Sequence, residues 1–364
     1  MLTRKFGNTG LTIPAVGFGG MRFTDINNNF AACVDSCRHA YDLGIRYFDT
    51  APGYCAGKSE NVFGEAFSGV KDVLISTKSN KKTPSEMRKN FEESLVRLKQ
   101  DKIAVFHIWY ILTYEDYLER EKNGVIDEAV KMKEEGLFDH LFISSHMNAE
   151  GLIKVLGTRI FEGVTIGYSP VNFLYRKEAV KFARSKNIAV VTMNPLAGGL
   201  IPKNPEVFSV LKRPQDKSVV EGALRFILSD PGVSLALVGV EKPEHADEAI
   251  AAISPFLPWS DAQRDALENS FNDAYEGICT GCGYCKECPE GLTPSQFMLA
   301  YNRKFLGAGD KAISDSLQWE WKIPPEKWDA CSECGLCEEQ CTQHLPIMER
   351  MKEIAKLERP ATAK

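Results

Sequence analysis

Short runs of apolar and β-branched residues recur along the first 260 residues of this 364-residue chain, separated by stretches with helical spacing. The runs are apolar almost throughout, which is typical of strands buried on both faces of a sheet. Eight strand–helix units over about 250 residues predict an α/β fold of the (β/α)8 TIM-barrel type. The expected strands are 15–18, 46–50, 73–77, 103–109, 141–144, 164–168, 189–193 and 235–240.

An open, doubly wound parallel sheet is the alternative fold for such a pattern. A dinucleotide-binding sheet of that kind carries GxGxxG after its first strand, and Gly17-Phe18-Gly19-Gly20 does not fit this spacing. Amphipathic helices are expected between the strands. The stretch 84–99, for example, has an early proline and then apolar residues at helical spacing. The sequence therefore favours the barrel.

Two runs of four cysteines lie near the C-terminus, at a spacing that ferredoxins use. In that spacing three close cysteines bind one cubane and the remote fourth cysteine binds the other. We therefore assign two [4Fe–4S] clusters with crossed ligands. The first set is Cys279, Cys282, Cys285 and Cys341, and the second set is Cys331, Cys334, Cys337 and Cys288.

Structural zinc and a disulfide framework are the other interpretations of these cysteines. Zinc needs only four ligands, fewer than the two runs provide, and disulfide frameworks belong to small secreted chains. Residues 1–20 do not read as a signal peptide, and no apolar run is long enough to span a bilayer. We therefore expect a protein of the reducing cytoplasm that does not bind membranes.

The cysteine region is expected to form a second domain. A proline-rich segment at 254–258 marks the end of the barrel, and a helix over about 261–276 leads to the cysteines. The 42 residues from 289 to 330 include a helical stretch at 295–305 and are too long for a compact β-hairpin ferredoxin. We expect a barrel domain over 1–260 and a smaller α-helical ferredoxin-like domain over 261–364.

Composition excludes some functions and leaves others open. Hydrophobic residues make up 44% of the chain, enough for a sizeable core. The formal net charge is −5, so nothing in the charge predicts binding to nucleic acid. A small-molecule substrate is the expected partner.

Polar and aromatic residues gather at the carboxyl ends of the expected strands, where barrel enzymes place their chemistry. Asp49 follows the second strand, Tyr54 lies in the next loop, and Lys78 follows the third strand. A tyrosine keeps its proton at neutral pH, a nearby ammonium lowers its pKa, and a carboxylate can hold that ammonium. The three residues could therefore protonate a carbonyl oxygen. His107 and Trp109 end the fourth strand.

Several segments resemble the aldo-keto reductase family, and the resemblance covers residues 1 to about 260. They include Gly7-Asn8-Thr9-Gly10-Leu11, Phe48-Asp49-Thr50-Ala51-Pro52-Gly53-Tyr54, Gly57-Lys58-Ser59-Glu60, Ser76-Thr77-Lys78, Ser144-Ser145-His146 and Asn194-Pro195-Leu196-Ala197-Gly198-Gly199-Leu200. The C-terminal part is similar to the cluster-binding extension of a bacterial and archaeal subgroup of that family.

The resemblance implies NAD(P)H bound across the top of the barrel. Ser144 and Ser145 would hold the carboxamide, and Met193 would replace the aromatic residue that often stacks on the ring. Leu196, Gly198 and Gly199 would lie along the pyrophosphate, and Gly239 would begin the segment that receives the adenosine end. The choice between NADH and NADPH stays open.

The sequence departs from this family at the fourth strand. The family usually places a catalytic histidine where this chain has Trp109. His107 lies two residues earlier on the same face of the strand, so it could point into the barrel at a deeper level. His107 is either a donor that substitutes for the missing histidine or a core histidine hydrogen-bonded to a neighbour. His146 is another candidate for the substitute donor.

Three functions remain open at this point. The barrel could reduce a carbonyl with NAD(P)H, with structural or regulatory clusters. It could instead hold a flavin or a redox substrate that the clusters connect to a ferredoxin-like electron partner, because a flavin couples hydride to single-electron chemistry. The chain could also be a non-catalytic binding subunit. We favour an aldo-keto reductase-like, iron–sulfur oxidoreductase, because Asp49, Tyr54 and Lys78 would otherwise be surplus.

Overall fold

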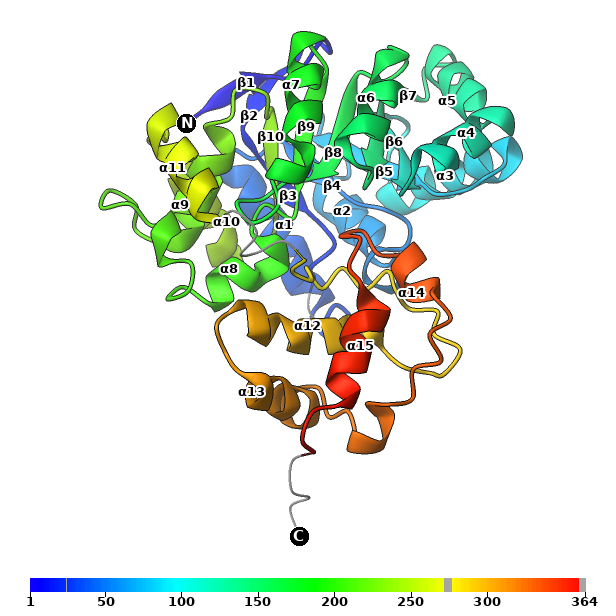
Figure 1. The fold of residues 1–364 in the computed structure, drawn as a ribbon. Helices are drawn as coiled ribbons and strands as arrows, with labels where there is room; N and C mark the ends of the chain where they lie inside the picture. The colour runs from blue at the N-terminus through cyan, green and yellow to red at the C-terminus, as the bar shows by residue number, and fades with distance from the viewer. Residues whose placement is uncertain (24, 272–276, 360–364) are drawn as a thin grey trace. The chain divides into compact units, whose positions relative to one another are not determined.

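The structure is a computed structural model that describes residues 1–23, 25–271 and 277–359. This part of the chain divides into two compact units. Met1–Leu196 and Phe208–Asp265 form the first unit, and Ala197–Val207 with the chain from Ala266 onward form the second. Figure 1 colours the chain from blue to red along its length.

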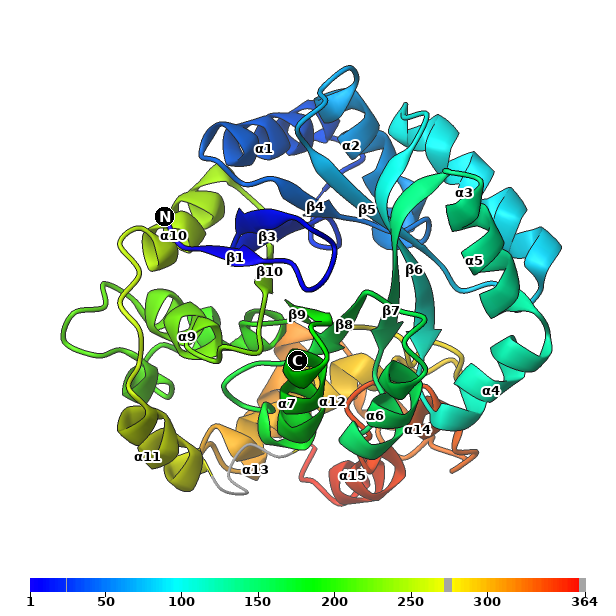
Figure 2. The same ribbon diagram turned by 90° about the horizontal axis from the view of Figure 1, so that it is seen from above.

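The first unit is the expected barrel. Within the described residues, eight parallel strands pair in the order β10-β3-β4-β5-β6-β7-β8-β9 and close on themselves. Figure 2 shows them as a ring with helices outside. The strands are β3 (Val16–Gly19), β4 (Tyr47–Asp49), β5 (Leu74–Ser79), β6 (Ile103–Ile111), β7 (Phe138–Ser145), β8 (Gly163–Gly167), β9 (Ala189–Met193) and β10 (Leu235–Gly239). Every predicted strand is confirmed, with ends that differ by a few residues.

Helices follow the strands on the outside of the ring. They are α1 (Phe30–Asp42), α2 (Ser59–Phe67), α3 (Pro84–Leu98), α4 (Tyr114–Lys122), α5 (Val125–Glu134), α6 (Ala149–Gly157), α7 (Lys177–Ser185), α9 (Val219–Leu228) and α10 (Pro243–Ile253). Helix α3 begins at the predicted proline and ends where Lys99 takes a left-handed φ of 51°. Its apolar face, with Met87, Phe91 and Leu98, is buried.

A β-hairpin of β1 (Thr3–Lys5) and β2 (Thr12–Pro14) precedes the barrel strands. Phe6 and Ile13 of this hairpin share one buried cluster with side chains from inside the barrel. Those barrel side chains are Tyr47, Val105, Phe142, Ala189, Val191, Leu235 and Leu237. None of them stands at the carboxyl end of its strand, so the hairpin closes the amino-terminal end and leaves the carboxyl end for a ligand.

The face of each strand follows from this interior cluster. Side chains at i and i+2 share a face of a strand, so the residue two positions after each cluster member also points inward. The residues placed this way at the carboxyl end are Asp49, His107, Ser144, Met193 and Gly239. Trp109 lies where β6 becomes irregular, and its ring contact with Tyr54 places it at the same end of the barrel.

The second unit is helical in its described residues. Its elements include α12 (Pro294–Phe305), α13 (Asp310–Asp315), α14 (Leu336–Glu339) and α15 (Ile347–Ala355), with α8 (Leu200–Lys203) from the earlier segment. Buried residues such as Phe297, Leu317 and Trp328 form its core, and several cysteines pack into or against that core. The helix predicted at 295–305 is confirmed as α12, and no strand occurs among the described residues of this unit.

The connection between the two domains was predicted as a helix over about 261–276. Helix α11 (Asp261–Phe271) confirms its first part, and residues 272–276 lie outside the described residues. The boundary that we expect between residues 260 and 261 stays a proposal. No helix in the described chain has the length and apolar character needed to cross a membrane.

Candidate active site and cluster-binding cysteines

Asp49 and Lys78 form a buried ion pair at the carboxyl end of the barrel. Their side chains are 2% and 1% exposed, and Lys78 Nζ lies 2.5 Å from Asp49 Oδ2. The Ser76 hydroxyl donates to the same carboxylate oxygen at 2.6 Å, and Lys78 Nζ donates to the Thr50 carbonyl at 2.8 Å. Burial lowers the pKa of Lys78, and the charge of Asp49 opposes that effect. The pair is therefore fixed in position and screened from water.

Tyr54 stands beside this pair on the loop after β4. It begins the short helix η1 (Tyr54–Gly57), and Lys78 Nζ lies 5.4 Å from the centre of its ring. Trp109 meets the Tyr54 ring edge to face, with 5.6 Å between ring centres and 90° between ring planes. The structure thus brings Asp49, Tyr54, Lys78 and Trp109 together.

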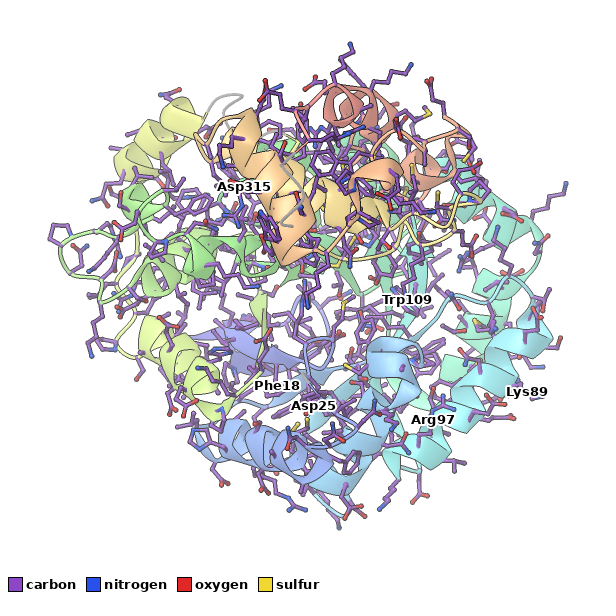
Figure 3. All side chains as sticks on the ribbon, turned by 90° about the horizontal axis from the view of Figure 1, so that it is seen from below. Phe18, Asp25, Lys89, Arg97, Trp109 and Asp315 are labelled. Carbon is purple, nitrogen blue, oxygen red and sulfur yellow. The ribbon has the colours of Figure 1, made fainter. Side chains whose placement is uncertain are left out.

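Trp109 lies at the inner wall of this site. Its side chain is 8% exposed, and Figure 3 shows it nearer the barrel axis than Lys89 and Arg97, which lie on the outer helix α3. The strand is irregular here, because the β6–β7 register shifts between Ile108 and Ile111 and Tyr110 has a φ of 65°. Bulges of this kind redirect side chains near active sites.

His107 lies deeper in the barrel and is fully buried. Its Nδ1 faces the Thr77 carbonyl at 3.4 Å, and its Nε2 lies 3.0 Å from the Thr165 hydroxyl. A carbonyl only accepts, so Nδ1 carries the proton and Nε2 accepts from Thr165. Burial and then the charge of Lys78 lower the pKa of His107 well below its usual value. The geometry favours the core histidine over a substitute donor.

Glu60 supports the site, although sequence reasoning assigned it no role. Its carboxylate is fully buried and accepts from the Thr77 hydroxyl at 2.5 Å and from Arg97 Nε at 2.6 Å. Thr77 directly precedes Lys78, so this network holds the end of β5 against α2 and α3. Glu60 lies in one of the segments that resemble the reductase family, and this was the sequence feature that could have indicated its role.

The residues predicted to bind the cofactor differ in how accessible they are to a ligand. Ser144, Met193 and Gly239 are on the inward face at the strand ends, whereas Ser145 is bonded to the protein itself. Its hydroxyl donates to the Ile111 carbonyl at 3.3 Å and accepts from the Met147 amide at 3.1 Å. Ser145 therefore anchors a loop, and the carboxamide role falls more naturally to Ser144.

The segment after β9 contains the remaining predicted positions. Leu196 is half-buried in the barrel unit. Gly198 and Gly199 belong to the second unit and have φ angles of 68° and 93°, which glycine adopts without strain. At the other end of the predicted site, a Cβ added to Gly239 would come within 2.8 Å of the Arg22 side chain. The contact is with the aliphatic stem of Arg22, so the missing side chain of Gly239 makes room for that stem at the end of β10.

Arg176 is a second supporting residue that the sequence did not reveal. Its buried guanidinium donates to the carbonyls of His146 at 2.8 Å, Met147 at 3.2 Å and Gly167 at 3.1 Å. Burial lowers its pKa to about 10, so it stays charged at neutral pH. It ties together the ends of β7 and β8, where carbonyl groups would otherwise lack partners.

The second cysteine set surrounds one cavity. Cys288, Cys331, Cys334 and Cys337 all line it, together with residues such as Pro294, Ile347 and Met351. Cys334 is exposed and the other three are half-buried. Cys288 thus lies with the second run although it belongs to the first run in sequence.

The first cysteine set is more deeply buried. Cys279, Cys285 and Cys341 are buried, and Cys282 is half-buried. Burial and the neighbouring sulfurs, including that of Cys341, raise the thiol pKa of Cys279 and Cys285 to about 12. Iron binding must therefore displace protons from these thiols. Both sets match the donor chemistry of [4Fe–4S] clusters, which thiolates bind.

Sequence comparison assigns the family. A sequence model described as the Aldo/keto reductase family matches residues 15–269. The chain belongs to the aldo/keto reductase family. A second match, described as a 4Fe-4S dicluster domain, covers residues 277–345. The protein is therefore an aldo/keto reductase-family oxidoreductase with an iron–sulfur domain, as predicted.

Individual relatives cover mainly the barrel of this aldo/keto reductase. L-galactose dehydrogenase of Arabidopsis thaliana is 27% identical over an alignment of 287 residues, and the match covers 69% of this chain and 88% of the relative. YqkF of Bacillus subtilis, named as an uncharacterized oxidoreductase, is 25% identical. The match covers 69% of this chain and 91% of YqkF. An aldo-keto reductase from Klebsiella pneumoniae in complex with NADPH has the same fold, with a TM-score of 0.64 at 18% identity, covering 74% of this chain and 96% of that one.

The state of His107 predicts how the stability of this aldo/keto reductase depends on pH. The folded pKa is far below the ordinary value of about 6.5, so below about pH 6.5 the unfolded chain binds a proton that the folded chain does not. Stability is thus lost as the pH falls. Between about pH 7.5 and 5.5, wild type should lose about 1.4 kcal/mol more than His107→Asn. Urea unfolding at both pH values measures this, and equal losses in the two proteins would contradict the neutral core histidine.

The crossed cysteine sets make a prediction about iron content. Cys288→Ala, Cys334→Ala and the double variant should all lose the same cluster and keep about four irons of about eight, since each cubane contains four. Cys288→Ala combined with Cys282→Ala should lose both clusters. Iron and acid-labile sulfide are measured after anaerobic purification. If the Cys288→Ala, Cys334→Ala double variant lost all its iron, Cys288 would belong with its own run.

Proposed function

We propose that this protein interconverts a small carbonyl compound and its alcohol with NAD(P)H, with Tyr54 as the proton donor. The observation that carries the proposal is the buried Asp49–Lys78 pair, whose ammonium lies 5.4 Å from the centre of the Tyr54 ring. An ammonium held near a phenol stabilises the phenolate that forms when the proton leaves. The name of the NADPH-bound Klebsiella relative supports a nicotinamide cofactor.

The end of the barrel fits a nicotinamide cofactor. Met193 is a half-buried apolar side chain on the inward face, Ser144 is small and polar, and Gly239 has no side chain to obstruct a ligand. The stem of Arg22 lies beside Gly239, and a guanidinium at the end of that stem would suit an anionic phosphate group. The cofactor, when bound, would supply the hydride, and its choice between NADH and NADPH is not fixed by these residues.

The protein's own part of the reaction is proton transfer and positioning. The Tyr54 hydroxyl would donate its proton to the carbonyl oxygen as negative charge develops there. Lys78 is held by Asp49 and the Thr50 carbonyl, so its charge stays close to Tyr54 throughout. Trp109 packs against Tyr54 as an apolar wall, which excludes water from one side of the reacting group. In the reverse direction Tyr54 would accept the proton from the alcohol.

A second candidate is a cluster-linked oxidoreductase with a flavin or a redox substrate at the barrel mouth. Trp109 stands where the resemblance places a catalytic histidine, and His107 is hydrogen-bonded to Thr165 inside the barrel. The second cysteine set includes the exposed Cys334, which would let a single-electron partner approach that cluster. These two observations support the alternative, whereas the Asp49–Lys78–Tyr54 arrangement supports the first proposal.

The proton-donor role predicts a large loss of turnover in two variants. Tyr54→Phe keeps the ring and removes the proton, so turnover should fall by roughly 10²–10⁴ while nicotinamide binding changes little. Lys78→Met should act similarly, because the phenolate loses its stabilising charge. Tyr117→Phe is the matched control, since it removes a hydroxyl bonded to Glu121 on α4. Full turnover in Tyr54→Phe would end the carbonyl-reductase proposal.

Trp109→His separates the two candidates. In a reductase the change returns a hydrogen-bond donor to the carbonyl oxygen, so activity with simple aldehydes should rise or at least be kept. If Trp109 instead forms the wall of a flavin site, the variant should bind flavin more weakly and gain no aldehyde activity. The assay follows NAD(P)H oxidation with a panel of aldehydes. Absence of activity in both wild type and variant would leave the second candidate.

A further inference from the structure

Arg350 is a buried cation in the second unit that none of the chemistry above uses. It lies in the second turn of α15, and only 6% of its surface is exposed. The guanidinium carbon lies 5.0 Å from the ring centres of both Tyr301 and Phe305 on α12. Its Nη1 donates to the Gly277 carbonyl at 2.6 Å, two residues before Cys279.

The surroundings of Arg350 supply little negative charge from carboxylates. Burial lowers the pKa of Arg350, and this effect is opposed first by Tyr301, then by Cys279 and Cys341, and only after them by Glu353. Glu353 is itself held by Lys304 at 2.7 Å and by the Tyr301 hydroxyl at 2.5 Å. A buried guanidinium needs a compensating negative charge, because removing a cation from water is costly. The structure offers that compensation at the first cysteine set.

A [4Fe–4S] cluster on the first set would supply this charge. Its core and four thiolates are negative overall, and reduction by one electron adds another unit of negative charge without breaking a bond. Burial opposes the gain of charge, so a cluster in the first set would be hard to reduce on its own. A fixed cation beside the cluster stabilises the reduced state more than the oxidised state.

We propose that Arg350 is the counter-charge of the cluster bound by Cys279, Cys282, Cys285 and Cys341, and that it raises the reduction potential of that cluster. The inference rests on the proposed cysteine sets and is independent of carbonyl reduction. Three amide or hydroxyl groups assist in the same direction. The Gly281 amide donates to Cys279 Sγ at 3.4 Å, the Leu345 amide to Cys341 Sγ at 3.4 Å, and Thr342 Oγ1 lies 3.3 Å from Cys282 Sγ.

Among the described residues of the second unit, Arg350 is the one buried cation, so the second set has no equivalent. Lys352 is the cation near Cys331, but its side chain is 56% exposed and pairs with Glu333 at 2.7 Å. The amino-terminal end of α15 also faces this set, but its Met348 amide donates to Glu338 at 2.7 Å. Solvent and these carboxylates screen both positive charges. Lys352 is therefore the matched control for Arg350.

The test is a redox titration of Arg350→Gln, Arg350→Lys and Lys352→Gln, followed by electron paramagnetic resonance with dithionite as reductant. In Arg350→Gln the ratio of reduced to oxidised cluster at a fixed potential should fall about tenfold, which is about 59 mV for a one-electron couple. Only one of the two clusters should shift. Lys352→Gln should leave this cluster within about twofold of wild type, and Arg350→Lys within about threefold, because the charge remains.

The same variants in a Cys334→Ala background identify which cluster moves. That background should retain only the cluster of the first set, so the shift must persist in it. An unshifted first-set cluster in Arg350→Gln would overturn the proposal, as would a tenfold shift in Arg350→Lys. If the glutamine variant does not hold iron, Arg350→Met takes its place, because it also removes the charge and should give the same tenfold fall. A shift that appears with intact clusters but disappears in the Cys334→Ala background would instead refute the cysteine sets.

Discussion

The buried Asp49–Lys78 pair is the interaction on which the barrel mouth depends. Neither charge could be buried alone, because an uncompensated charge in a barrel interior would cost about 3–5 kcal/mol. Their pairing requires β4 and β5 to be neighbours in the observed register, with Asp49 opposite Ser76. The register of β5 with β6 places Lys78 opposite His107, whose pKa is lowered first by burial and then by the ammonium. The ion pair thus fixes the ends of β4 and β5 and the position of the lysine charge.

The rest of the barrel serves to keep this pair dry and in place. The hairpin closes the amino-terminal end through Phe6 and Ile13, so the interior opens only where the strands end. Glu60 holds the end of β5 from behind, and Arg176 holds the ends of β7 and β8. A rigid frame of this kind suits proton transfer, which needs its donor within a narrow range of distances.

The iron–sulfur domain contains a buried cation as the barrel does. In the barrel a carboxylate compensates the buried Lys78, whereas in the second unit the buried Arg350 donates to the Gly277 carbonyl, two residues before Cys279. The two cysteine sets differ in exposure, from the buried Cys279 and Cys341 to the exposed Cys334. Clusters in such different surroundings would differ in reduction potential, since hydrogen bonds, charge and solvent all tune it.

Much of this structure could be predicted from the sequence, and the rest could not for physical reasons. Continuous apolar runs identified the strands, because a strand that is buried on both faces needs apolar side chains at successive positions. Period-two alternation along β6 predicted His107 and Trp109 on one face, but it could not show that Thr165 on β8 would hydrogen-bond to His107. The partners of Glu60, Arg176 and Arg350 come from distant parts of the chain, so no local pattern reports them.

The central claim is that Tyr54 and Lys78 act as one proton-donating unit, and a double-mutant cycle tests it most directly. The measurement is single-turnover NAD(P)H oxidation by wild type, Tyr54→Phe, Lys78→Met and the double variant with one aldehyde substrate. If the lysine acts through the tyrosine, the double variant will be no slower than the slower single variant. Losses that multiply in the double variant would show that the two residues act independently, and would contradict this account.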